Sequence, residues 1–154
     1  MKSNLLMVLI FTSFIMGNPS PCEKANAPIN TENKDTMINE TITITVNSKT
    51  FTAILWDNSS AKAFKDMLPM TITMTDLNAN EKYYDLPTKL PTKSSNPGTI
   101  HNGDLMLYGS NTLVLFYKSF STSYSYTRLG SIDDTVGLQK VLGAGNVSVT
   151  IDKN

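Results

Sequence analysis

The stretch TITITV at residues 41–46 shows the pattern that decides the fold, because isoleucine or valine alternates strictly with threonine. Alternate residues of a strand point to opposite faces, so the aliphatic side chains are predicted to face a core and the threonines to face water. Apolar residues alternate with threonines again at residues 70–75, and with serine, threonine and aspartate at residues 147–152. Since β-branched residues favour extended backbone, we predict three half-buried strands at these positions.

Other segments extend the strand pattern. Residues 51–56 and 113–117 are almost continuously apolar, which is typical of strands covered on both faces. Residues 81–86 and 104–108 are shorter candidates, and turn-forming residues such as Asn and Gly connect neighbouring segments. Together with an extended segment within residues 118–129, these give about eight predicted strands.

Two short helices are predicted between the strands. Asn58 or Ser59 is suited to cap a helix at residues 60–68. The aspartates at 133–134 suit the positive start of a second helix, which Gly143 would end. Two short helices cannot cover both faces of an open sheet of this size. The predicted fold is therefore mainly β, a closed eight-stranded barrel with two short capping helices.

The composition excludes several classes of protein. The 154 residues hold 13 Lys and Arg against 13 Asp and Glu, with one Cys and one His. This balance argues against a basic nucleic-acid binder, a disulfide scaffold or a disordered chain. A single histidine and no Gly-rich phosphate loop predict neither a metal site nor a cofactor.

Residues 1–27 are predicted to be a signal peptide or a lipoprotein leader. A short polar start precedes the apolar run LLMVLIFTSFIM at 5–16. The small-x-small sequence at 25–27 suits a signal peptidase, and a cut after Gly17 is the alternative. Cys22 lies where a lipid-attachment cysteine would lie, or is discarded with the leader. We expect a secreted or cell-envelope protein that meets the membrane only through export or a lipid anchor at Cys22.

The rest of the chain divides into a linker and one domain. Residues 28–40 are rich in Asn, Thr, Glu and Lys, which is typical of a flexible linker. The barrel domain is predicted over residues 41–154. Because this domain has no cysteine, a hydrophobic core must stabilise it.

Two loop segments are candidates for function. Residues 86–103 are long for a loop in a compact domain and contain three prolines. They would form a lid, rim or docking surface, or else a rigid strap across the barrel end. In residues 118–129 an extended backbone would place Phe120, Tyr124, Tyr126 and Arg128 on one face, with serines on the other.

Arg128 is the only arginine beside 12 lysines. This choice indicates a place where a planar cation matters, either stacked on a tyrosine or holding a carboxylate with two bonds. The alternative is a structural ion pair with Asp133 or Asp104. His101, similarly, could serve a serine nucleophile or simply bond its loop neighbours.

Several motifs carry a family resemblance. The chain resembles the bacterial cyclophilin-like domain family of exported and lipid-anchored proteins, some of which are joined to a flavodoxin-like domain. The motifs are LPMTITMTDLN at 68–78, KYYDLP at 82–87, NPGTIHNGDLMLYG at 96–109, TLVLFYKSF at 112–120 and SYSYTRLGSID at 123–133. The resemblance implies a closed eight-stranded barrel and a possible flavodoxin-like partner.

The resemblance also implies a second candidate activity. True cyclophilins isomerise X-Pro bonds with an arginine beside an apolar pocket. This chain has no F-x-x-R-type segment in its early strands, and Arg128 lies late. An isomerase would therefore have to use Arg128 beside Phe116 and Phe120.

Two hypotheses follow. The favoured one is a non-catalytic module that binds a peptide or small ligand at the barrel end, between residues 86–103 and 120–128. The alternative is a peptidyl-prolyl isomerase, which would need a deep apolar pocket beside Arg128. The candidate ligand-binding residues are Arg128, Phe116, Phe120, Tyr124, Tyr126 and His101.

Overall fold

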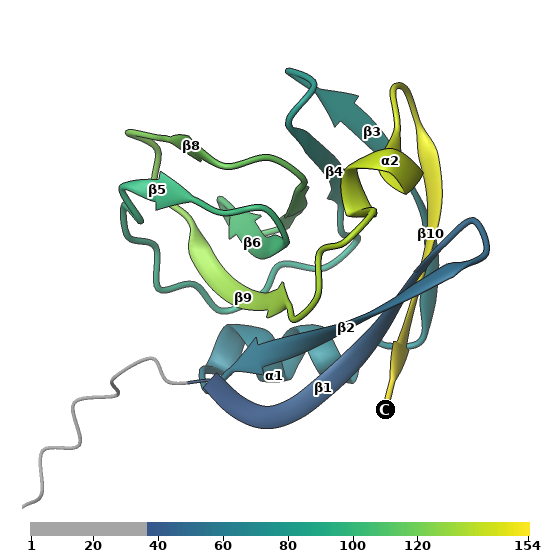
Figure 1. Cartoon of the computed structure of the whole chain (residues 1–154). Helices are drawn as coiled ribbons and strands as arrows, with labels where there is room; N and C mark the ends of the chain where they lie inside the picture. The colour runs from purple at the N-terminus through teal and green to yellow at the C-terminus, as the bar shows by residue number, and fades with distance from the viewer. Residues whose placement is uncertain (1–36) are drawn as a thin grey trace, which may run out of the picture. The chain divides into compact units, whose positions relative to one another are not determined.

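The computed structural model describes residues 37–154, in which eight antiparallel strands close into a barrel (Figure 1). The predicted fold class is confirmed. The predicted leader at 1–27 and Cys22 lie outside the described residues. The barrel strands are β1 (Met37–Val46), β2 (Lys49–Trp56), β3 (Met70–Leu77), β4 (Glu81–Asp85), β6 (Asp104–Tyr108), β7 (Thr112–Phe116), β9 (Thr127–Ile132) and β10 (Val147–Lys153). Around the barrel their order is β1-β10-β3-β4-β7-β6-β9-β2.

The three strands predicted from alternating apolar and polar residues are neighbours in the barrel, in the order β1, β10, β3. Val46 pairs with Val149, which pairs with Ile72, so one row of aliphatic side chains points into the core. On the outside, the hydroxyls of Thr71 and Thr150 lie 3.0 Å apart. The alternation therefore builds one wall with an apolar inner face and a polar, threonine-rich outer face. β1 already begins at Met37, before the expected domain start at Thr41.

Strand β7 is apolar on both faces, as predicted. Leu113 and Leu115 point into the barrel core, whereas Val114 and Phe116 belong to a second hydrophobic cluster on the outside. We call this second group the outer cluster. Its buried members are Ile100, Met106, Val114, Phe116 and Tyr126, with Tyr83 and Phe120 packed against them.

A layer that the sequence patterns did not predict covers the outer cluster. It contains a two-stranded sheet of β5 (Thr99–Ile100) and β8 (Phe120–Ser121), beside β6 and β9 in Figure 1. A bridge between Ser95 and Tyr126 and a bond from the Thr122 amide to the Gly98 carbonyl (2.9 Å) extend the sheet. We call residues 95–103 with 118–126 the outer layer.

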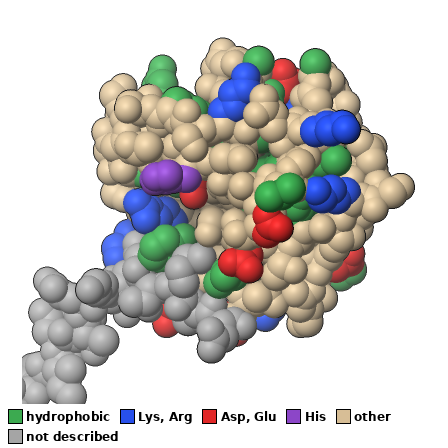
Figure 2. Space-filling view, viewed as in Figure 1, with side chains coloured by type: hydrophobic (Ala, Val, Ile, Leu, Met, Phe, Trp, Pro, Cys, Tyr) green, Lys and Arg blue, Asp and Glu red, His purple; other side chains and the backbone are tan. Residues whose placement is uncertain are grey.

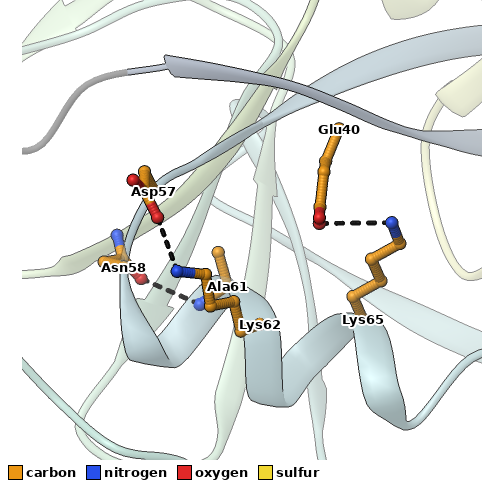
Figure 3. Close-up of polar contacts among 6 residues, drawn as sticks. All are labelled: Glu40, Asp57, Asn58, Ala61, Lys62 and Lys65. Atoms are coloured by element: carbon orange, nitrogen blue, oxygen red, sulfur yellow. Dashed lines mark hydrogen bonds and ion pairs between the residues drawn. The ribbon is translucent and has the colours of Figure 1, made fainter.

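Helix α1 (Ser59–Asp66) follows β2 and is capped by Asn58, one of the two predicted caps. The Asn58 side-chain oxygen accepts a hydrogen bond from the Ala61 amide at 2.8 Å (Figure 3). Its side-chain amide donates to the Arg128 carbonyl at 2.9 Å, which ties the helix to β9. Figure 3 also shows Lys65 paired with Glu40, at 3.2 Å.

Helix α2 (Leu138–Leu142) is shorter than predicted, and its predicted start at 133–134 is wrong. The amide of Asp133 still donates to the Thr52 carbonyl at 3.0 Å, so strand pairing extends to this point. The Asp134 carboxylate accepts from the Val136 amide at 2.9 Å and caps a turn instead of a helix. The predicted end at Gly143 is confirmed.

A buried lysine lies inside the barrel, at the end beside α2. Lys82 is fully buried, and its ammonium pairs with Asp76 at 2.7 Å. It also donates to the carbonyls of Gly143 (2.8 Å) and Gly145 (2.6 Å), and lies 5.4 Å from the Tyr117 ring centroid. Each ammonium proton thus has an acceptor, which a buried cation requires.

The same contacts perturb two neighbouring groups. Hydrogen bonds from Lys82 and then Tyr117 lower the pKa of Asp76. Burial, followed by the Asp76 carboxylate, raises the pKa of Tyr117 to about 12. The lowered pKa therefore keeps the Asp76 carboxylate anionic at neutral pH.

Replacing this lysine should destabilise the barrel strongly. We expect Lys82→Met to lower the free energy of unfolding by about 3–5 kcal/mol, because it leaves the Asp76 carboxylate without its counter-ion and the carbonyls of Gly143 and Gly145 without their donor. Lys65→Met, which removes only the exposed pair with Glu40, should cost no more than about 1 kcal/mol. Urea unfolding followed by circular dichroism measures both. Equal effects of the two substitutions would contradict this account of Lys82.

Candidate functional site

A pocket of about 400 Å³ opens on the outside of the barrel, beside the outer cluster. Four tyrosines from three parts of the chain line it, together with two carboxylates. We call it the tyrosine pocket and define it by Tyr83, Tyr108, Tyr124, Tyr126, Glu81 and Asp85. Its volume falls in the range typical of small-molecule sites.

Strand alternation and register place these side chains together. Glu81, Tyr83 and Asp85 occupy alternate positions of β4, so all three point outward while Lys82 points inward. Tyr108 pairs with Thr112 across β6 and β7, and Thr112 pairs with Asp85 across β7 and β4. Three adjacent strands thus form the floor of the pocket.

The aromatic rings form a continuous run from the outer cluster to the surface. Phe116, which is fully buried, contacts Phe120 and Tyr126 with ring centroids 5.7 and 5.5 Å away. Tyr126 lies 5.7 Å from Tyr108, and Tyr108 lies 6.3 Å from Tyr124. Tyr124 is 63% exposed, so the run ends in solvent. The buried rings hold the exposed ones in place.

The charges that line the tyrosine pocket are all negative. Glu81 and Asp85 contribute carboxylates, and no lysine or arginine belongs to the lining. Asp85 accepts a hydrogen bond from the Thr112 hydroxyl at 2.6 Å. Burial raises the pKa of Glu81, and no described residue forms an ion pair with it. The lining therefore suits neutral or cationic groups better than anions.

Arg128 lies in a separate and much smaller pocket, of about 90 Å³. Its guanidinium carbon is 5.1 Å from the ring centroid of Trp56, the only tryptophan. The predicted stacking therefore occurs, but on tryptophan in place of tyrosine. Within the described part of the chain Arg128 makes no ion pair, so the alternative of a pair with Asp133 or Asp104 is wrong.

His101 lies at the rim of the same small pocket and is exposed. Its ring nitrogen Nδ1 is 3.7 Å from the Asp104 carboxylate, which accepts a shorter hydrogen bond from the His101 backbone amide at 2.7 Å. Burial raises the pKa of Asp104. These contacts match the expectation of a loop histidine that bonds its neighbours.

The structure thus divides the predicted site residues into three groups. Tyr124 and Tyr126 line the tyrosine pocket, whereas Arg128 and His101 line the small pocket. The remaining two, Phe116 and Phe120, lie in or against the outer cluster. The predicted common face of residues 118–129 is interrupted, because only 120–121 and 127–132 are strands.

The long loop at residues 86–103 lies only partly at the barrel end. Leu86 and Leu90 join the barrel core, and the Pro91 carbonyl accepts a bond from Ser60 of α1, so only this first part closes the barrel end. From Ser95 onward the loop belongs to the outer layer. The loop forms many backbone hydrogen bonds, which favour the predicted rigid strap over the predicted lid.

Four pocket residues were not among those predicted from the sequence: Tyr83, Tyr108, Glu81 and Asp85. One signal was present, because the alternation in EKYYD at 81–85 already places Glu81, Tyr83 and Asp85 on one face. The contribution of Tyr108 depends on register between distant strands, which no local pattern gives.

We also searched the described residues for metal sites, membrane-spanning helices, further pockets and charged patches. Among residues 37–154 no group of three or more His, Cys, Asp or Glu side chains is arranged to hold a metal ion. No helix in that range is long and apolar enough to cross a membrane. A second depression, of about 580 Å³ beside α2, has a polar lining without aromatic residues. On the face drawn in Figure 2, acidic and basic side chains are interspersed.

Comparison with known proteins agrees with this architecture. Residues 44–152 match the model of a family described as the Cyclophilin-like family. The matched range runs from within β1 to within β10 and includes the outer layer and both pockets. A comparison with curated proteins finds no match. The chain belongs to the cyclophilin-like family.

Proposed function

We propose that this chain is an exported, non-catalytic binding module that holds a peptide or small-molecule ligand in the tyrosine pocket. The observation that carries the proposal is the pocket itself: an open volume of about 400 Å³ walled by four tyrosines. Tyrosine offers a large contact area at a low cost in conformational entropy, which is why adaptable binding surfaces use it.

The pocket combines a rigid floor with an exposed wall. Its floor consists of hydrogen-bonded barrel strands, and Tyr126 is fixed by contacts with Phe116 and Tyr108. Tyr124 is mostly exposed, and among the described rings it contacts only Tyr108. A ligand can therefore cover Tyr124 without unpacking the outer cluster.

The surroundings of Arg128 favour this proposal over a peptidyl-prolyl isomerase. An isomerase of the kind considered above needs its arginine beside an apolar pocket large enough for a proline ring. The pocket beside Arg128 is about 90 Å³ and is lined partly by His101 and Asp104. Phe116 is fully buried and lines neither pocket.

The cellular part of the proposal rests on the sequence. The apolar leader within residues 1–27, with Cys22 behind it, supports export to the cell envelope, with or without a lipid anchor. A flavodoxin-like partner is proposed from the family resemblance alone.

A titration with a mixed ligand panel tests the binding function. The panel contains short peptides and small molecules of acidic, basic, neutral and proline-rich character, and NMR follows the tyrosine ring signals. We expect at least one class to give saturable shifts at the pocket tyrosines. Tyr124→Ser should weaken this binding about threefold to tenfold, because it removes one aromatic contact.

Val136→Ser is the matched control for Tyr124→Ser. Val136 is also a large exposed apolar residue, 72% exposed, but it lies before α2 and outside the tyrosine pocket. Its replacement should leave the affinity unchanged. The proposal fails if no class shifts the pocket signals, or if the two variants bind alike.

A prolyl isomerisation assay tests the proposal that the module is not a catalyst. We expect the protein to leave the cis–trans rate of an X-Pro peptide at its uncatalysed value, because Arg128 and Phe116 share no pocket for the proline ring. Wild type and Arg128→Ala are compared. Acceleration by the wild type that is lost in Arg128→Ala would establish an enzyme instead.

A further inference from the structure

We propose that the tyrosine pocket selects organic cations and takes an alkylammonium group, carried either by a small amine or by a modified lysine side chain. This inference rests on the proposed function, because it names the ligand chemistry of the same pocket. It follows from the arrangement of the rings and from the sign of the charge around them.

The rings of three pocket tyrosines are inclined to one another and not stacked in parallel. Tyr108 is nearly perpendicular to Tyr124, at 87°, and tilted by 54° from Tyr126. Rings inclined in this way form walls around a volume, whereas parallel rings would stack and close it. Each aromatic face is electron-rich, so a cation within about 6 Å of several rings is attracted by all of them.

The carboxylates strengthen the preference for positive charge. Glu81 and Asp85 lie on either side of Tyr83 along the outward face of β4. No basic side chain belongs to the pocket lining to neutralise them. An anionic ligand would be repelled by both carboxylates, whereas a cation would be attracted by them.

The environment of Glu81 is an independent reason to expect a cationic ligand. Its carboxylate is partly buried and has no ion-pair partner among the described residues. Burial of an unpaired charge is costly, and burial raises the pKa of this group. A bound alkylammonium would supply the missing counter-charge inside the pocket. The lysine nearest along the chain, Lys82, cannot do so because it points into the barrel and is bound to Asp76.

The test compares choline with 3,3-dimethyl-1-butanol, which has the same shape but no charge. Calorimetric titration of the purified protein measures both affinities. We expect choline to bind about tenfold more tightly, because only the cation gains from the ring faces and carboxylates. Equal affinities for the two probes would overturn the inference.

A substitution assigns the selectivity to the pocket. Glu81→Gln should reduce the preference for choline severalfold while leaving the affinity for 3,3-dimethyl-1-butanol unchanged. Glu40→Gln is the matched control, because Glu40 pairs with Lys65 of α1 and lies outside the pocket. Thermal unfolding of both variants verifies that they fold. Loss of the preference in Glu40→Gln, or its retention in Glu81→Gln, would contradict the assignment.

A third probe distinguishes the two sources of the cation. Tighter binding of a trimethyllysine peptide than of choline would assign a peptide side chain, and tighter binding of choline a small amine. If neither cation binds while another class in the ligand panel does, cation selectivity fails but the binding function stands. If nothing binds to the pocket, both fail.

Discussion

The two apolar faces of strands β6 and β7 are the constraint on which the rest of this structure depends. Leu113 and Leu115 fill the barrel, so Val114 and Phe116 must point outward from the same strand. Burial of each such side chain stabilises the fold by about 1.5–3 kcal/mol. The barrel alone cannot bury side chains that lie on its outer surface. The outer layer, residues 95–103 and 118–126, covers these outward-pointing side chains and so removes them from water. It does not reach across β4, and the tyrosine pocket lies at that uncovered edge.

Strand β4 connects the interior of the barrel with the pocket. Lys82 and Tyr83 are consecutive and therefore point to opposite faces. Inside, the ammonium of Lys82 holds Asp76 of β3 and the carbonyls that follow α2. Outside, Tyr83 belongs to the pocket wall. The interactions that stabilise one end of the barrel thus also fix the strand that carries the pocket's negative charges.

Local patterns predicted the elements well, and non-local pairing explains the failures. Alternation found the threonine-rich strands because it operates within a few residues. The helix expected at 133–134 failed because Asp133 is still paired with β2. For the site, the alternation in residues 118–129 indicated which side chains share a face of that segment, but not which residues from other strands lie beside them. Arg128 and Tyr126 are close in sequence, yet one stacks on Trp56 while the other contacts Tyr108.

Native-state amide hydrogen exchange tests the role of the outer layer most directly. The amides of Ser95, Thr122 and Tyr126 hold this layer together with bonds of 2.9–3.0 Å. We predict that all three are protected in the wild type, and that Phe116→Leu lowers their protection together while the paired amides of β1 and β10 keep theirs. Exchange of the three amides at unprotected rates in the wild type, or equal loss of protection in β1 and β10, would contradict this prediction.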